Sequence, residues 1–466
     1  MRLDGEAVAR VMGGALEGAA GVATGVSIDS RTLAPGDLFF AIRGPRFDGH
    51  AFVADAFRRG APGAVVASEY ASLSEEAPDR FLIRVSDPTE ALGALAREER
   101  LKSGARIVAI TGSLGKTTTK EAAAAAIGAT RSVFRSRGNL NNQWGLPLSL
   151  LAREDEEVGV VELGMSAPGE IRTLTEIAVP DCGVLTTIAE AHLEFFGSVA
   201  AIAAAKGELF EALPRSATAV VNADDELVRA QADRFSGRCV TYGFSAGVDV
   251  RGTDYAARPS GLVFEVTAFG GPAVSVTCGL EGRHNAGNVL AGLAAAAVLD
   301  VPIERAARGG AALAPLPGRG TRVRLRGGAL ALDETYNSSP RALRAVLSEF
   351  AALPAGRRIV VVGDMRELGE DAEPLHRACG QLAGRLPLDL IVGVGALGGT
   401  LADAAAAAGA ETALAADPDE AAALLEGVLR SGDLVLFKAS RAVGLDAALR
   451  RLEAPTGDGA ESGGDA

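Results

Sequence analysis

The chain contains 466 residues, 48% of them hydrophobic and 23% charged, which is the composition of a globular protein with room for two to four domains. Its 59 acidic and 46 basic residues give a net charge of −13, which argues against a general nucleic-acid binder because such a protein needs a basic surface. The four cysteines lie far apart without a CxxC pair, so a reducing, cytoplasmic setting is favoured over a disulfide framework or a zinc site.

Residues 1–104 are predicted to form a small N-terminal domain. The first six residues lack the basic and apolar parts of a signal peptide. Short apolar runs at 37–42, 63–67 and 81–85 alternate with turns rich in Pro and Gly and with Ala-rich helical stretches. This alternation indicates a mixed α/β unit.

Residues 105–318 are predicted to form a larger domain around a parallel sheet. Residues 107–111 are typical of a buried strand, a Gly-rich loop follows, and an Ala-rich helix is expected from Lys120. Further apolar runs at 158–163, 183–188 and 218–222 alternate with helical segments, as in βαβ units. Alternation of polar and apolar residues over 247–280 indicates an antiparallel insertion. The apolar stretch at 289–299 is too short for the about 20 residues that cross a bilayer.

A turn-rich stretch at 315–320 marks the start of a third α/β domain over residues 319–454. Apolar runs at 359–363, 390–393 and 434–437 alternate there with helices. Residues 455–466 are rich in Gly and acids and are expected to form a disordered tail. The sequence therefore predicts an α/β protein of three domains.

The strongest local signal is the loop that follows the strand at 107–111. Its glycines let backbone N–H groups turn toward phosphate oxygens, the helix N-terminus adds positive charge, and Lys116 supplies a mobile cation. Thr117 is placed to offer its hydroxyl to Mg²⁺. The loop lacks the first glycine of the general pattern, but its place between a strand and a helix predicts nucleotide binding. The residues involved are Thr111, Gly112, Ser113, Gly115, Lys116, Thr117 and Thr118.

Three further residues are candidates for chemistry beside this loop. Glu162 ends a predicted strand, and His192 follows the strand expected to end at Ile188. Ligands bind beyond the carboxyl ends of parallel strands, although a solvated acid or a structural histidine is the ordinary alternative at such positions. Lys206 lies just downstream in an Ala-rich helix, where a solvated lysine would be unremarkable. Asn285 and its i+3 neighbour Asn288 open another helix, where amides can read a purine edge or cap the helix.

The order of these motifs resembles the Mur ligase family, whose members form amide bonds with ATP in bacterial cell-wall precursor synthesis. The resemblance implies an N-terminal UDP-sugar-binding domain, a central phosphate-loop ATPase domain with a parallel sheet, and a C-terminal Rossmann-like domain. Residues 27–32, 35–41 and 48–50 resemble an N-terminal segment shared with the ligase that adds diaminopimelate or lysine. Residues 138–148 resemble instead the G-N-x-N-N-x-x-G-x-P-L segment of the branch that adds D-alanyl-D-alanine, and the Asp-Asn-Pro-Arg motif of the other ligase is absent.

The resemblance also implies cofactors, substrates and residue roles. The cofactors would be ATP and Mg²⁺, and a monomer would join D-alanyl-D-alanine to UDP-N-acetylmuramoyl-tripeptide through an acyl phosphate. The Mg²⁺ ligands would be Thr117, Glu162, His192 and, once carbamylated, Lys206. The catalytic residues would be Lys116, Glu162, His192, Lys206 and Lys438. Beyond the loop, ATP would contact Asn285, Asn288, Arg319, Asp333, Glu334 and Asn337, and the substrate would contact Ser30, Arg31, Asn139, Asn141 and Asn142.

Several residues depart from the family pattern. The chain has Asp333-Glu334 where two aspartates are usual, Thr187 in place of an asparagine, Ser338-Ser339 where Ala-Asn is usual, and Ala439 in place of a glycine. None of these removes a group that the chemistry requires, so they bear on fine specificity. The alternatives are a sister ligase that adds a single amino acid, a folate-polyglutamate ligase, a nucleotide-dependent regulator or kinase, and a catalytically silent nucleotide-binding protein.

Overall fold

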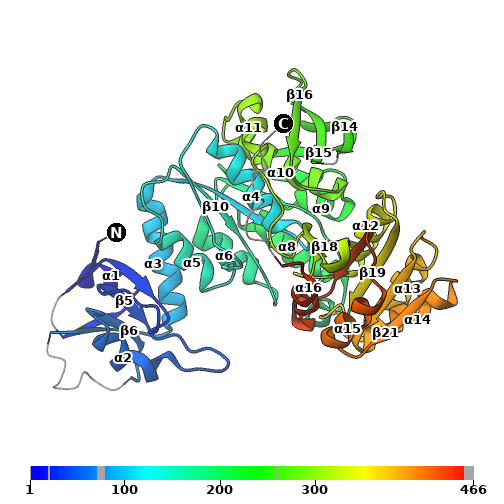
Figure 1. Ribbon diagram of the computed structural model, residues 1–466. Coiled ribbons are helices and arrows are strands. Elements are labelled where there is room, and N and C mark those ends of the chain that lie inside the picture. Colours follow the sequence, from blue (N-terminus) through cyan, green and yellow to red (C-terminus); the bar gives the residue numbers. More distant parts are fainter. Residues whose placement is uncertain (1, 19–20, 71–78, 259, 456–466) are drawn as a thin grey trace, which may run out of the picture.

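The computed structural model describes residues 2–18, 21–70, 79–258 and 260–455. They form three α/β domains that follow one another in space as they do along the chain (Figure 1). The blue N-terminal domain and the yellow-to-red third domain lie on either side of the central one. The disordered tail predicted for 455–466 lies outside the described residues, apart from Pro455.

The N-terminal domain is built on a mixed sheet. Its elements are β1 (Leu3–Asp4), α1 (Gly5–Val11), β2 (Ala15–Gly18), β3 (Val22–Ala23), β4 (Gly25–Ser27), β5 (Asp37–Phe40), η1 (Gly49–Phe52), α2 (Val53–Arg58), β6 (Gly63–Ala67), β7 (Phe81–Val85) and α3 (Pro88–Ser103). The main sheet has the order β2-β7-β6-β5-β4, with only β2 antiparallel to its neighbour in the described part. The strands expected at 63–67 and 81–85 are confirmed.

The central domain contains a nine-stranded sheet in the described residues. Its elements are β8 (Arg106–Thr111), α4 (Lys116–Gly128), β9 (Val133–Arg135), α5 (Gly145–Leu151), β10 (Val158–Glu162), α6 (Glu170–Ala178), β11 (Cys182–Leu185), α7 (Leu193–Phe196), α8 (Val199–Ala212), β12 (Thr218–Asn222), α9 (Glu226–Ala232), β13 (Arg238–Gly243), β14 (Val250–Arg258), β15 (Gly261–Ala268), β16 (Val274–Cys278), α10 (Arg283–Val298) and α11 (Ile303–Gly310). The order is β16-β15-β14-β13-β12-β11-β8-β10-β9, parallel from β9 to β14. The antiparallel segment expected over 247–280 is confirmed, and it extends the main sheet.

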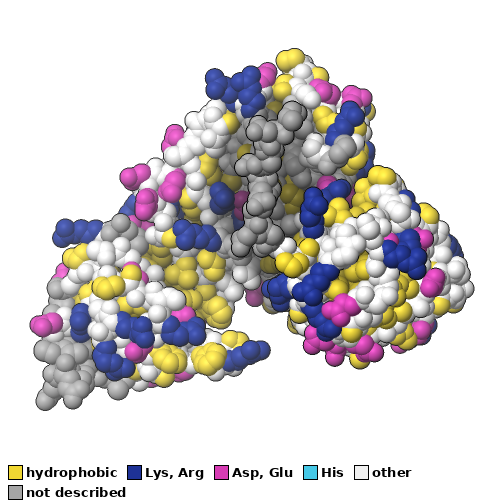
Figure 2. Space-filling view, in the orientation of Figure 1, with side chains coloured by type: hydrophobic (Ala, Val, Ile, Leu, Met, Phe, Trp, Pro, Cys, Tyr) yellow, Lys and Arg dark blue, Asp and Glu magenta, His cyan; other side chains and the backbone are white. Residues whose placement is uncertain are grey.

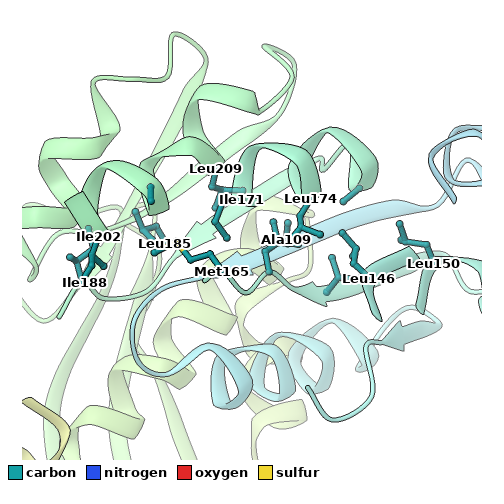
Figure 3. Packing of buried hydrophobic residues seen from close by; sticks show 14 of the residues in the cluster. Ala109, Leu146, Leu150, Met165, Ile171, Leu174, Leu185, Ile188, Ile202 and Leu209 are labelled. Carbon is teal, nitrogen blue, oxygen red and sulfur yellow. The ribbon is translucent and has the colours of Figure 1, made fainter. Parts of the chain in front are cut away.

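Alternate residues of β8 bury on opposite faces of this sheet, as the period of a strand requires. Val108 and Ile110 pack with the Ala-rich helices α4 and α10, whereas Ile107 and Ala109 pack under α5, α6 and α8. Figure 3 shows the second layer, in which Ile171 of α6 and neighbouring side chains cover Ala109. Burial on both faces explains the continuous apolar runs of the parallel strands.

Two predicted boundaries in this domain are wrong. The helix after the Gly-rich loop begins at Lys116 and not at Lys120, because Gly115 caps it in a left-handed conformation with φ 81°. The strand expected to reach Ile188 ends at Leu185. The chain turns toward the phosphate loop directly after Leu185. There the hydroxyl of Thr186 donates to the carbonyl of Leu114 at 2.7 Å.

The third domain has a six-stranded sheet in the part that the structure describes. Its elements are β17 (Thr321–Arg324), η2 (Arg326–Gly328), β18 (Leu330–Glu334), α12 (Pro340–Ala351), β19 (Arg357–Gly363), η3 (Gly369–Asp371), α13 (Ala372–Ala383), β20 (Leu390–Val394), α14 (Gly395–Ala407), β21 (Thr412–Ala415), α15 (Pro418–Val428), β22 (Asp433–Lys438), η4 (Arg441–Val443) and α16 (Asp446–Leu452). The order is β17-β18-β22-β19-β20-β21, parallel except for β17. The last strand in the chain, β22, therefore lies in the middle of the sheet.

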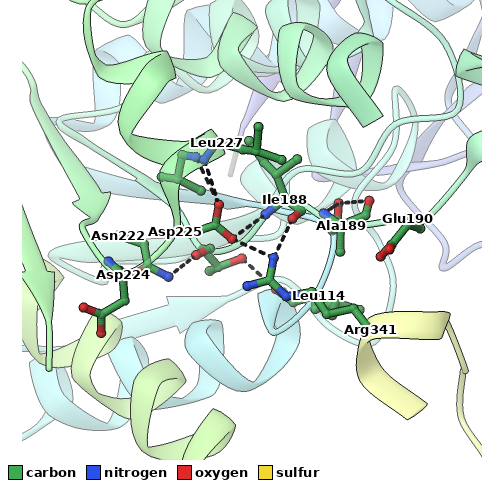
Figure 4. A network of polar contacts seen from close by, with 12 residues as sticks. Leu114, Ile188, Ala189, Glu190, Asn222, Asp224, Asp225, Leu227 and Arg341 are labelled. Carbon is green, nitrogen blue, oxygen red and sulfur yellow. Dashed lines mark hydrogen bonds and ion pairs between the residues drawn. The ribbon is translucent and has the colours of Figure 1, made fainter. Parts of the chain in front are cut away.

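Polar contacts join the domains on both sides of the central one. Arg100 of α3 donates to the carbonyls of Ala178 and Val179 and pairs with Asp181 at 2.8 Å. On the other side, Arg341 of α12 donates to the carbonyl of Ile188 at 2.8 Å and to the buried carboxylate of Asp225 at 2.9 Å (Figure 4). These contacts fix how the three sheets face one another.

None of the described helices is both long and apolar enough to cross a membrane. The four cysteines are unpaired.

Candidate active site

A cavity of about 1660 Å³ lies where the three domains meet. Its walls come from the carboxyl ends of parallel strands in the central and third domains, and Pro45 of the N-terminal domain closes one side. The face drawn in Figure 2 is hollowed between the N-terminal and third domains. Ligands of open α/β sheets bind at such edges, so the fold places this cavity where a substrate is expected.

The phosphate loop is bound to the segment after β11 through Thr186 and Ala189, which were not among the predicted site residues. Ser113 donates to the carbonyl of Ala189 and accepts its N–H, at 3.1 and 3.0 Å. Thr186 lies so close to Gly112 that a Cβ there would collide with its hydroxyl, and a Cβ at Gly115 would collide with the amide of Asn288. Only glycine fits these two positions, which explains the spacing of the loop.

Lys116 lies at the end of this loop and lines the cavity. Its ammonium donates to the carbonyl of Gly112 at 2.8 Å. Burial lowers the pKa of Lys116, and the nearby carboxylate of Glu162 opposes that effect. The carbonyl of Gly112 therefore binds the ammonium of Lys116, and a phosphate oxygen can replace this carbonyl as the acceptor.

Glu162 forms the centre of a small polar cluster. Its two carboxylate oxygens accept from the hydroxyl of Thr117 and from the amide of Asn141, each at 2.9 Å. Among the described residues, no three His, Cys, Asp or Glu side chains lie together as a complete metal cage. One carboxylate and one hydroxyl fit Mg²⁺, which keeps several waters and shares phosphate oxygens with its substrate.

Lys206 of α8 lines the same cavity and is almost fully buried. Burial lowers its pKa well below the usual value, and the charge of Lys116 adds to that effect. A buried amine that gives up its proton becomes nucleophilic, which is the chemical property that carbamylation needs.

His192 lies on the segment after β11 and lines the same cavity. Its backbone is left-handed, with φ 66°, and its Nδ1 lies 2.5 Å from a carboxylate oxygen of Glu367 in the third domain. Contact with His192 lowers the pKa of Glu367. Glu367 was not among the predicted site residues, although it follows the predicted strand at 359–363.

The third domain contributes a second group of polar residues. The guanidinium of Arg319 lies 3.9 Å above the ring of Tyr336. The ammonium of Lys438 contacts the carboxylate of Glu334 at 3.1 Å and donates to the carbonyl of Asn337 at 3.0 Å. These groups line the cavity opposite the phosphate loop.

Most of the predicted site residues line this one cavity. They are Ser113, Gly115, Lys116, Thr117, Thr118, Asn139, Asn141, Asn142, Glu162, His192, Lys206, Asn285, Asn288, Arg319, Glu334, Asn337 and Lys438. Some of these also have structural contacts, since the amide of Asn142 accepts from two N–H groups at the start of α5 and Asn285 bonds to Asn288 at 3.1 Å.

Five predicted residues do not line the cavity in this arrangement. Thr111 donates to the carbonyl of Leu163, and Gly112 packs against Thr186. Asp333 accepts from the N–H groups of Gly318 and Thr335, so its carboxylate stabilises the turn that carries Arg319. The remaining two, Ser30 and Arg31, lie in the N-terminal domain, where Ser30 is buried and Arg31 pairs with Asp29. Their assignment to ATP and to the substrate stays a prediction.

The fold and the cavity define a class of protein, namely a three-domain α/β protein whose central domain carries a phosphate-loop nucleotide site. The family models named Mur ligase family, catalytic domain; Mur ligase middle domain; and Mur ligase, glutamate ligase domain match residues 22–100, 110–296 and 318–441. The chain belongs to the Mur ligase family.

Similar proteins cover almost the whole chain. A UDP-N-acetylmuramoyl-tripeptide–D-alanyl-D-alanine ligase from Synechocystis sp. is 37% identical over 92% of this chain and 92% of its own length. A crystal structure of MurF from Acinetobacter baumannii superposes with a TM-score of 0.88 at 28% identity, covering 97% of this chain and 99% of that one. MurF ligase from Thermotoga maritima in complex with ADP gives a TM-score of 0.79 at 32% identity, covering 92% and 96%. The match over more than nine tenths of the chain confirms the predicted α/β fold with three domains.

Proposed function

We propose that the protein is an ATP-dependent amide ligase that adds D-alanyl-D-alanine to UDP-N-acetylmuramoyl-tripeptide in the cytoplasm, as a monomer. The observation that carries this proposal is the cavity that is lined by the phosphate loop and Glu162 of the central domain and by Lys438 of the third domain. A site assembled in this way suits a reaction that brings together a nucleotide, an acid and an amine. The relative from Synechocystis, which carries this activity in its name, supports the same substrates.

The reaction proceeds in two steps on the substrates. The terminal carboxylate of the tripeptide attacks the γ-phosphorus of ATP, which forms an acyl phosphate and releases ADP. The neutral amine of the dipeptide then attacks the acyl carbon, and phosphate leaves as the amide forms. Closure of the third domain over the site would keep water away from the acyl phosphate, which would otherwise hydrolyse.

Residues of the central domain bind the phosphates in this scheme. The backbone N–H groups of the loop bind the phosphate oxygens, and Lys116 exchanges the carbonyl of Gly112 for the transferred phosphoryl group. Thr117 and Glu162 would hold Mg²⁺, with His192 and carbamylated Lys206 completing the site. The ion would offset the negative charge that develops during phosphoryl transfer. Asn141 holds the carboxylate of Glu162 in place.

Residues of the third domain complete the site. Arg319, whose guanidinium lies over the ring of Tyr336, contacts the nucleotide, and Lys438 reaches the phosphoryl group from the third domain. Glu334 balances the charge of Lys438 and holds its ammonium until substrate arrives. Asn285 and Asn288 lie against the base. Asp333 fits a supporting role better than a direct one, because its oxygens bond to the turn around Arg319.

The test is phosphate release from ATP and Mg²⁺ with the UDP-linked tripeptide, with D-alanyl-D-alanine, with both, or with neither. We expect release only with both, and a product heavier than the tripeptide by the dipeptide less water. Phosphate release with a single amino acid in place of the dipeptide would keep the ligase reaction but assign the substrate of a sister ligase. Nucleotide binding without phosphate release would contradict the ligase assignment. The Lys116→Ala variant should lose about a hundredfold to a thousandfold in turnover, the range that a single electrostatic group contributes.

A further inference from the structure

One side chain of the third domain contacts a candidate Mg²⁺ ligand of the central domain. Nδ1 of His192 is buried and lies 2.5 Å from Oε2 of Glu367, and no hydrogen bond of regular geometry to that nitrogen is found in the described part of the chain. A backbone bond accompanies this contact, because the N–H of Glu194 donates to the carbonyl of Glu367 at 3.0 Å. Two segments more than 170 positions apart in the sequence are thus joined at the edge of the cavity.

The segment that carries Glu367 is firmly anchored in its own domain. The N–H of Met365 donates to buried His376 at 2.8 Å, and the N–H of Arg366 donates to Ser440 at 2.9 Å. The carboxylate of Asp364 accepts from two N–H groups at the start of α14, at 3.0 and 3.1 Å. Glu367 itself has left-handed backbone geometry, with φ 64°, which costs a non-glycine residue of the order of 1 kcal/mol. The backbone that carries the Glu367 side chain is therefore anchored on the side that faces His192, in a strained conformation of the kind found at functional sites.

This contact decides which nitrogen of His192 is available as a metal ligand. A carboxylate only accepts hydrogen bonds, so the nitrogen that faces Glu367 must carry the proton. The neutral imidazole then has its lone pair on Nε2. Metal-binding histidines commonly donate their other N–H to a carboxylate, which fixes the tautomer and the orientation of the ring.

We propose that Glu367 is a positioning residue for His192, so that the third domain fixes the imidazole through which the central domain binds a divalent cation. This inference rests on the proposed metal role of His192 and adds a link between domains to it. Because the carboxylate and the imidazole belong to different domains, cation binding and the docking of the third domain favour each other. The third domain therefore takes part in binding the cation without contacting it.

The experiment measures Mn²⁺ binding to the full-length protein saturated with ADP, from the loss of the free-ion EPR signal. No turnover is involved, so activity of the loaded enzyme is not the readout. Glu367→Ala should weaken Mn²⁺ binding about 10–100-fold, the usual cost of losing a carboxylate behind a metal-bound histidine. Glu367→Gln keeps an acceptor for the Nδ1 proton and should recover part of that loss.

A control variant and a test in the His192→Ala protein separate the loss of His192 positioning from a general loss of structure. Glu370→Gln removes the same charge three positions away, where the structure describes no hydrogen bond or ion pair, and should bind Mn²⁺ like the unmodified protein. In the His192→Ala background, Glu367→Ala should have no further effect, because its only route to the ion is gone. Unchanged or tighter Mn²⁺ binding by Glu367→Ala, or an equal loss in the His192→Ala background, would overturn the proposal. Either result is distinct from failure of the ligase assignment, which shows as absence of phosphate release with both substrates.

Discussion

The contact between Asp225 and Arg341 allows us to predict which of its two residues contributes more to the free energy of unfolding. Asp225 begins α9, where its carboxylate accepts from the N–H groups of Leu227 and Val228, and it also accepts from the N–H of Ile188 at 3.3 Å. Its side chain is only 3% exposed, whereas that of Arg341 is 45% exposed. Loss of the carboxylate therefore leaves buried donors unpaired, while loss of the arginine leaves a carboxylate that retains three N–H partners.

These contacts set the expected magnitudes. Asp225→Ala loses a helix cap, which contributes about 1–2 kcal/mol, and leaves a buried N–H unpaired at a cost of about 1–2 kcal/mol more. Arg341→Ala should cost about 1–2 kcal/mol, because water already reaches the guanidinium. The matched control is Arg344→Ala one turn further along α12, whose ion pair with Glu190 is partly exposed on both sides and should contribute less than about 1 kcal/mol.

Urea unfolding followed by tryptophan fluorescence measures these differences in stability. The only tryptophan, Trp144, lies at the start of α5 and reports on unfolding of the central domain. We expect the midpoint to fall most for Asp225→Ala, less for Arg341→Ala and least for Arg344→Ala. Equal midpoints for Asp225→Ala and the unmodified protein, or a larger effect of Arg344→Ala than of Arg341→Ala, would refute the reasoning.

Three further predictions concern other parts of the molecule. Burial lowers the pKa of His376, so the unfolded chain takes up a proton first as the pH falls. The stability advantage of the unmodified protein over His376→Gln should therefore shrink as the pH falls through about 6.5, in urea unfolding at pH 7.5 and 5.5. Gly115→Ala forces a left-handed alanine against Asn288 and should weaken ADP binding at least about tenfold by calorimetry, whereas unchanged binding would exclude the loop as the nucleotide site. Tyr336→Ala removes the ring under Arg319 and should weaken ADP binding about 2–5-fold, with Tyr336→Phe as the neutral control.

Local patterns in the sequence predicted the sheets well because parallel strands buried on both faces are continuous apolar runs. The strand at 218–222 has the predicted bounds. The start of the helix at Lys116 was missed, because alanine content marks the middle of that helix while Gly115 and the loop geometry decide its first turn. Helix propensity is a property of single residues, whereas the position of a helix cap depends on the backbone geometry around it, so propensity alone does not locate the first turn.

The site was predictable to the extent that it rests on motifs within one segment. Lys116 and Thr117 follow from a strand–loop–helix pattern that is visible locally. Glu367 and Asp225 were missed because their importance comes from partners in other domains, and sequence spacing carries no information on such contacts. Asp333 illustrates the reverse case, since its position in a motif suggested ATP contact while its oxygens bond to the backbone of a turn.

The central place of β22 in the third sheet has a consequence for how the domain folds during synthesis. Strands β18 and β19 each pair with β22 and not with one another, so the sheet cannot close until residues 433–438 have left the ribosome. The closure is completed still later, when Ala454 bonds to the carbonyl of Arg324 beside the bridge between Leu325 and Glu453. The nascent third domain is therefore left in two unjoined parts while the central domain can already fold. Lys438 ends the closing strand, so the site gains this lysine in the same event that joins the two parts of the domain.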